Sequence, residues 1–130
     1  MTADKRQQLV ERARDLLSKQ VVHWEAPAPW AQAQDESSSY RQLAVAVRQA
    51  LAGDLGAIPT LRRVFGEPFF ARTNSHNEYG LASLGLALLG DRESLEHIRG
   101  VMPINLNRET RPLALALLEE PTDLTPRSED

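Results

Sequence analysis

The sequence has no cysteine among its 130 residues, which excludes disulfide bonds, thiol catalysis and thiolate metal sites. It also lacks a long hydrophobic run. The longest weakly interrupted apolar stretch, Leu81 to Leu89, is about half of what a membrane-spanning helix needs. Because Asp4, Lys5 and Arg6 place charges at the very start, we expect no secretory signal and a cytoplasmic location.

A strong excess of one charge is missing too. The formal net charge is −3, so no field of the whole molecule attracts nucleic acid or an acidic membrane, and we expect neither as the principal partner. Only two of the 15 basic residues are lysine, which suggests a bacterial, GC-rich genome. The length fits one domain, for which we predict residues 1–120, followed by an acidic, flexible tail at 121–130.

Catalytic motifs are also absent: the sequence contains no phosphate loop, dinucleotide fingerprint or nucleophile elbow. Glu93 and His97 share one helix face, but a zinc site needs three or four protein ligands and no second pair accompanies them. Ser75 and His76 are adjacent, without a third group to orient them. We therefore expect a protein that is not an enzyme, with no catalytic residues, no metal and no cofactor.

The most informative feature present is an internal repeat. Residues 51–65 and 88–102 align without a gap at an offset of 37, with five of fifteen positions identical and three apolar exchanges, among them Phe65 with Met102. A period in the thirties is typical of stacked supersecondary units, none of which buries its apolar face alone. The repeat therefore predicts helical hairpins that lie side by side over a shared core.

Apolar periodicity, prolines and glycines divide the chain into helices. The predicted parts are an N-terminal helix (3–21), a Trp/Pro-rich connection (22–38), a first repeat (39–66), a second repeat (78–102) and a half repeat (110–119). We expect a serine among residues 37–39 to cap the second helix and Thr110 to cap the last. Gly80 and Gly85 suggest close contact between helices.

The last helix contains only Leu and Ala from Leu113 to Leu118, so it must be covered on most sides. The N-terminal helix, the segment from Trp24 to Trp30, or a second chain could cover it. Coverage within the chain is favoured, because large exposed apolar patches are rare on monomers. We thus expect a monomer, with a homodimer through helix 110–119 as the alternative.

Two phrases carry a resemblance to a known family. The first joins Ala50-Leu51-Ala52-Gly53-Asp54 to Ala57-Ile58-Pro59-Thr60-Leu61, and Leu88-Leu89-Gly90-Asp91 opens a weaker copy. They resemble HEAT-type helical repeats, in the short form of bacterial repeat proteins and phycobilin-lyase relatives. The resemblance implies an all-α fold, a short right-handed alpha-alpha superhelix of about two and a half hairpins with an extra N-terminal helix. A generic helical bundle remains the alternative.

In stacked hairpins, the turns within units share one edge and the connections between units share the other. The second edge collects the connections 66–77 and 103–110, and loops on a rigid scaffold are where binding residues concentrate. We predict that this edge, with the adjoining helix surface, binds a protein partner. The predicted contact residues are Arg72, Asn74, His76, Asn77, Asn105, Asn107 and Arg108.

Three classes of function remain open. The first is a small adaptor or scaffold, with inhibitor and immunity-type proteins inside this class. The second is a nucleic-acid-binding module that uses the arginine-bearing helices, although acids are interleaved there and no aromatic stacking set accompanies them. Arginine–carboxylate pairs between repeats are the favoured reading of those arginines. The third is a small-ligand-binding or lyase-like enzyme, which would need a deep polar pocket.

Overall fold

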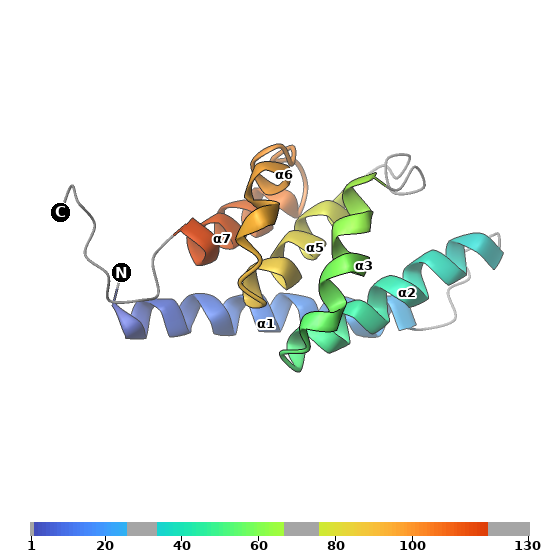
Figure 1. Ribbon diagram of the computed structural model, residues 1–130, viewed down its shortest axis with the longest axis horizontal. Helices are drawn as coiled ribbons and strands as arrows, with labels where there is room; N and C mark the ends of the chain where they lie inside the picture. The colour runs from blue at the N-terminus through green and yellow to red at the C-terminus, as the bar shows by residue number, and fades with distance from the viewer. Residues whose placement is uncertain (1, 26–33, 67–75, 120–130) are drawn as a thin grey trace.

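The protein is all-helical wherever its computed structural model describes it, namely at residues 2–25, 34–66 and 76–119 (Figure 1). The α-helices are α1 (Ala3–Glu25), α2 (Gln34–Leu51), α3 (Ile58–Arg63), α5 (Asn77–Leu88), α6 (Leu95–Arg99) and α7 (Asn107–Glu119). Single turns of 3-10 helix, η1 (Leu55–Ala57), η2 (Val64–Gly66) and η3 (Arg92–Ser94), flank the short helices. The all-α prediction is confirmed for these residues.

Helix α1 is four residues longer than predicted and takes up the start of the expected connection. Val21 and Trp24 are both buried, three residues apart, so they continue the stripe that Ala13 and Leu17 begin. The helix ends shortly before Pro27, whose ring disfavours helical geometry in the preceding residue. Packing of this stripe outweighs the Pro-rich composition that suggested an earlier end.

The second helix begins at Gln34, earlier than expected, so Ser37, Ser38 and Ser39 lie inside it and none of them caps it. The predicted cap was wrong because serine costs a helix interior only a few tenths of a kcal/mol, which the surrounding turns readily outweigh. Trp30, the end of the segment that could cover the last helix, lies outside the described residues.

The turns inside the two repeats have the same conformation. Gly53 and Gly90 have φ angles of +79° and +74°. The amide of Asp54 donates to the carbonyl of Gln49 at 2.9 Å, and 37 residues later the amide of Asp91 donates to Leu86 at 3.0 Å. Each turn is a Schellman motif closed by a left-handed glycine, which satisfies the last carbonyls of the preceding helix. The sequence repeat is therefore also a conformational repeat.

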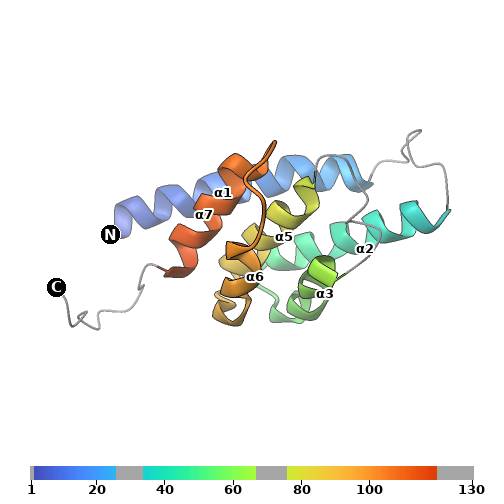
Figure 2. The same ribbon diagram turned by 90° about the horizontal axis from the view of Figure 1, so that it is seen from above.

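The first hairpin (α2 to η2, residues 34–66) lies at one end of the molecule, the second hairpin (α5 to α6, residues 77–99) in the middle, and α7 at the other end (Figures 1 and 2). Helix α1 packs against α2, α5 and α7. Leu51 and Leu88, the repeat partners, line one small cavity together with Val10 and Leu117. The two hairpins thus share one apolar seam under α1.

Helix α7 begins at Asn107, three residues before the predicted cap, so Thr110 is an interior residue and Pro112 lies in the second turn. The early start follows from tertiary contact. Gly80 of α5 allows so close an approach that a Cβ atom there would lie 2.0 Å from both Asn107 Oδ1 and Thr110 Oγ1. The close helix contact predicted for Gly80 is confirmed.

The apolar face of α7 is covered from within the chain, as favoured. Leu113, Leu117 and Leu118 are buried, and α5, α6 and α1 pack against the helix. On α1, the guanidinium group of Arg6 donates to the carbonyl of Leu117 at 3.0 Å. The N-terminal helix is therefore one of the elements that cover α7.

Candidate partner-binding groove

The predicted binding residues differ in how exposed they are in the structure. Arg72 and Asn74 lie outside the described residues, while the other five are placed. Asn105, in the connection before α7, and Arg108, in the first turn of α7, are exposed. Of the remaining three, His76 and Asn77 are half-buried and Asn107 is buried.

Asn107 was wrongly predicted as a contact residue, because none of its surface is exposed. Its Nδ2 donates to the carbonyl of His76 at 2.8 Å, and its Oδ1 accepts from the Thr110 hydroxyl at 3.2 Å. Asn77 has a similar internal role, since its Oδ1 accepts from the backbone amide of Leu106 at 3.2 Å. Both asparagines fasten the start of α7 to the start of α5. A polar residue in a loop can brace that loop instead of facing a partner.

His76 retains a place in the candidate site. It has a left-handed backbone, with φ of +57°, directly before α5. Its ring lies edge-on to Tyr79, with ring centres 5.6 Å apart and planes at 85°. The backbone turn at the end of the connection therefore brings the imidazole against the first turn of α5.

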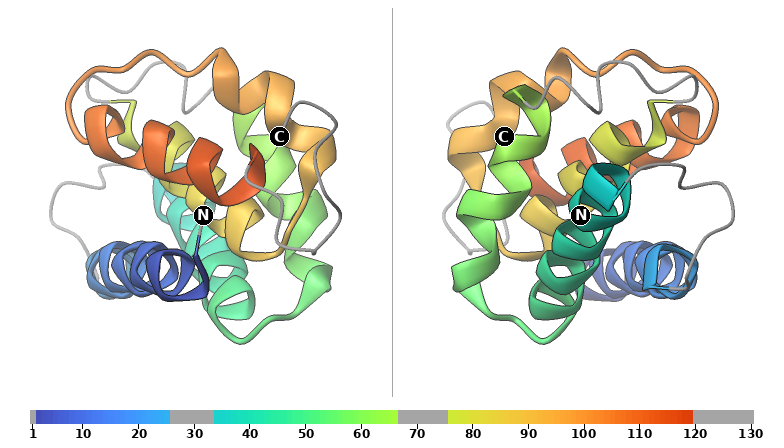
Figure 3. Two further views of the ribbon diagram at one scale, coloured as in Figure 1. Left: turned by 90° about the vertical axis from the view of Figure 1, so that its left-hand side faces the viewer. Right: turned by 90° about the vertical axis from the view of Figure 1, so that its right-hand side faces the viewer.

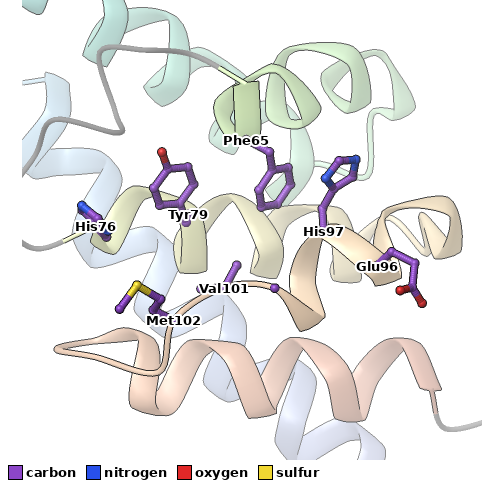
Figure 4. Close-up of a pocket in the computed structure, with 8 residues that line it drawn as sticks. Phe65, His76, Tyr79, Glu96, His97, Val101 and Met102 are labelled. Carbon is purple, nitrogen blue, oxygen red and sulfur yellow. The ribbon is translucent and has the colours of Figure 1, made fainter.

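Four rings form a continuous row, which we call the ring row: His97, Phe65, Tyr79 and His76 (Figure 4). Phe65 lies between His97 and Tyr79, with ring centres 5.2 Å and 6.2 Å away and planes inclined by only 12° and 15°. The rings come from the end of the first hairpin, from α6 and from the start of α5. The row thus spans the junction between the two hairpins.

A groove of about 400 Å³ lies along this row, and we call it the ring groove. Val101, Met102 and Gly100 complete its wall, with Glu96 at its edge (Figure 4). The Met102 side chain is 57% exposed, which is unusual for a residue of this type. The ring groove therefore offers a recess of ring faces and a flexible thioether.

The electrostatics of the ring groove are mild. Burial raises the pKa of the Tyr79 phenol, and the negative charge of Glu78 adds to that effect, so the Tyr79 hydroxyl stays neutral at physiological pH. Glu96, at the edge, forms an ion pair with Arg99. A recess with one neutral hydroxyl and a compensated carboxylate suits apolar side chains with a few directed hydrogen bonds.

The charged residues beside the groove pair across the hairpins. The guanidinium group of Arg62, on α3, makes a bidentate contact with the buried carboxylate of Asp91, at 2.8 Å and 2.5 Å. It also reaches Glu93 at 3.0 Å. The hydrogen bonds from Arg62 are the largest cause of the lowered pKa of Asp91. The predicted arginine–carboxylate pairing between repeats is confirmed at Arg62.

Because Glu93 turns toward Arg62 and His97 stacks on Phe65, these two residues do not converge as a pair of metal ligands. No group of three His, Asp or Glu side chains placed for a metal ion occurs within the described part of the chain. Helix α6 instead contacts the first hairpin through the stacking of His97 on Phe65, and α7 through the bond from Arg111 to the Arg99 carbonyl.

Sequence reasoning singled out His76 but missed the other rings. Phe65 and His76 lie near the two ends of the connection predicted at 66–77, Met102 precedes the one predicted at 103–110, and all three residues line the ring groove. The ring row was not predicted, because it is assembled from residues far apart in the chain. One clue was available: the repeat pairs Phe65 with Met102, and both lie in the wall of the groove.

No family model matches the sequence, no curated protein is significantly similar to it, and no solved structure significantly resembles its fold. Among the residues that the structure describes, no helix combines the length and apolarity needed to cross a membrane. The ring groove is the feature on which function can be argued.

Proposed function

We propose that this protein is a non-catalytic protein-interaction module that binds its partner through the ring groove. The observation that carries the proposal is the ring row beside a largely exposed Met102, at the junction of the two hairpins. Aromatic and methionine side chains are enriched where protein interfaces are most deeply buried. Binding energy in such interfaces concentrates in a few anchors that fill a recess.

The mode of binding follows from the shape and chemistry of the groove. A volume of about 400 Å³ accommodates a few large apolar side chains. The partner would insert them against Phe65 and Met102, and the Tyr79 hydroxyl would supply a directional hydrogen bond. Methionine adapts its shape to different neighbours, so Met102 would mould to the inserted side chain.

The proposed scaffold is a short right-handed superhelix of HEAT-like hairpins. Support comes from the two turns of equal geometry, 37 residues apart, and from the 3-10 turn and short helix that follow each of them. Repeats of this kind form a rigid frame whose loops can vary. As an adaptor, scaffold or inhibitor, such a frame would present the ring groove with little change on binding.

The test is selection of a random peptide library on the immobilised full-length chain, followed by affinity measurement for the enriched peptides. We expect apolar sequences that bind wild type and lose at least about tenfold in affinity with Met102→Glu, which puts a charge into the groove. Val22→Glu is the matched control, because Val22 is 59% exposed on α1 and does not line the ring groove. A lack of enriched peptides, or equal affinity of wild type and Met102→Glu, would contradict the proposal.

Single-stranded nucleic acid is a second candidate, favoured by one observation. The near-parallel planes of Phe65 with His97 and Tyr79 resemble a platform on which bases could stack. Against it, Arg62 and Arg99 are engaged by carboxylates. Titration of a labelled oligonucleotide at several salt concentrations separates the two candidates, since phosphate binding weakens steeply with salt.

A further inference from the structure

A second groove lies on the first hairpin. This hairpin is at the end of the molecule away from α7 (Figure 3). It has a volume of about 720 Å³ and runs between α2 and α3. Gln42 and Val45 of α2 and Thr60 of α3 are among the residues in its wall. Val45 is 59% exposed, so this end face includes an apolar side chain in open contact with solvent.

The 37-residue repeat shows what this face corresponds to. Gln42 and Thr60 occupy the positions that Tyr79 and His97 hold in the second hairpin. There, both rings contact Phe65 of the preceding hairpin. The second hairpin thus uses this face to pack on its neighbour.

A further pair of repeat positions also shows that this face is covered in the second hairpin and open in the first. Val45 corresponds to Ala82, which has no exposed surface, whereas Val45 itself is largely exposed. In the first hairpin, α3 and its extension η2 pack against α5 of the second hairpin, together with α2. The equivalent face of the first hairpin is therefore shaped like a site where a helix packs.

The end groove is lined by basic side chains. Arg41 and Arg63 both line the end groove and are exposed, and no acidic residue is among the described residues that line it. Of two acids on neighbouring elements, Asp54 accepts from the amide of Gly56 at 2.8 Å, and Glu25 pairs with Arg48 at 2.7 Å. The described wall of the end groove, with two arginines and no acid, therefore complements negative charge.

We propose that this end groove docks an acidic amphipathic helix of a partner protein, seated where a preceding hairpin would pack. Its apolar residues cover Val45, and its carboxylates face Arg41 and Arg63. Spacing of three and four residues places acids and apolar side chains on one helical face, in the manner of helix-in-groove recognition. Complementary charge fixes the orientation of the helix and speeds its association.

The test is selection from a displayed library of helix-favouring peptides with four randomised positions on one face, using the full-length chain as bait. We expect the enriched peptides to combine acidic and apolar residues on that face. With the double variant Arg41→Glu/Arg63→Glu, their affinity falls on the order of tenfold, because two attractive contacts become repulsive. Replacing the peptide acids with lysine restores binding to that variant, which a misfolded chain could not do.

The matched control is Lys5→Glu/Arg92→Glu, which makes the same change in net charge at exposed positions elsewhere. It leaves the affinity for acidic peptides within about twofold, as does Met102→Glu in the ring groove. The proposal is overturned if no peptide is enriched, if the enriched faces are not acidic, or if the two double variants weaken binding equally. It is also overturned if a single-stranded oligonucleotide, and no peptide, binds in a way that needs Arg41 and Arg63.

Discussion

Gly80→Ala tests whether the contact between α5 and α7 determines the fold. Two effects of opposite sign compete. In an isolated helix, alanine in place of glycine stabilises by about 1 kcal/mol. In the folded protein, the new Cβ atom would lie 2.0 Å from Asn107 Oδ1 and from Thr110 Oγ1, far inside any permitted contact distance.

Relief of this overlap must move two side chains that have no exposed surface. Asn107 would give up its bond to the His76 carbonyl, and Thr110 its bond to Asn107. Buried polar groups that lose their partners cost about 1–3 kcal/mol each, so the overlap costs roughly 2–6 kcal/mol. After the gain in helix propensity, we expect a net loss of about 1–5 kcal/mol in the free energy of unfolding.

The assay is urea unfolding followed by far-UV circular dichroism, with thermal unfolding beside it. A net loss of this size lowers Tm by roughly 3–20 °C for a domain of this length. Gly100→Ala is the matched control, because its Cβ would meet no heavy atom closer than 3.5 Å. We expect that control within about 1 kcal/mol of wild type. If Gly80→Ala is as stable as Gly100→Ala, the close approach of α5 and α7 does not constrain the fold and our reasoning is wrong.

Three further predictions concern the turns and the pair between the hairpins. Arg62→Ala lowers the urea midpoint more than Arg48→Ala does, because it leaves the buried carboxylate of Asp91 without its cation, while Glu25, the partner of Arg48, is much more exposed. Since the folded pKa of Asp91 lies below its usual 3.8, the stability contributed by the pair is present above about pH 4. It is lost as pH falls through the lowered pKa, so urea midpoints of wild type and Arg62→Ala measured at intervals from pH 7 to 2 must converge at the acid end. Gly53→Ala and Gly90→Ala each cost about 1–2 kcal/mol, measured by urea unfolding, because both positions have positive φ angles; an unchanged midpoint would contradict the predicted strain.

Much of the fold could be predicted from local patterns. Gly53 and Gly90, each followed by aspartate, identified the two turns, because few residues other than glycine tolerate a left-handed conformation. The apolar stripe of α1 was predicted up to Val21, and its continuation through Trp24 depends on burial against the rest of the protein. Local pattern therefore located the helices well and their ends less well.

The candidate site was harder to predict than the fold. Asn77 and Asn107 belong to a polar loop pattern that fits both an exposed contact and an internal brace, and only the packing of α7 on α5 decided between them. The ring row depends on residues 65, 76, 79 and 97, which no single helix brings together. Local periodicity could therefore not predict that these four rings lie together.

The order of apolar residues, glycines and prolines along the chain determined the repeat, the helices and the turns, since each of these follows from interactions between residues close in sequence. Tertiary structure alone decided which polar groups are buried, which rings meet and which face of the first hairpin stays open. Those outcomes depend on contacts between residues tens of positions apart, and such contacts form only when whole helices pack.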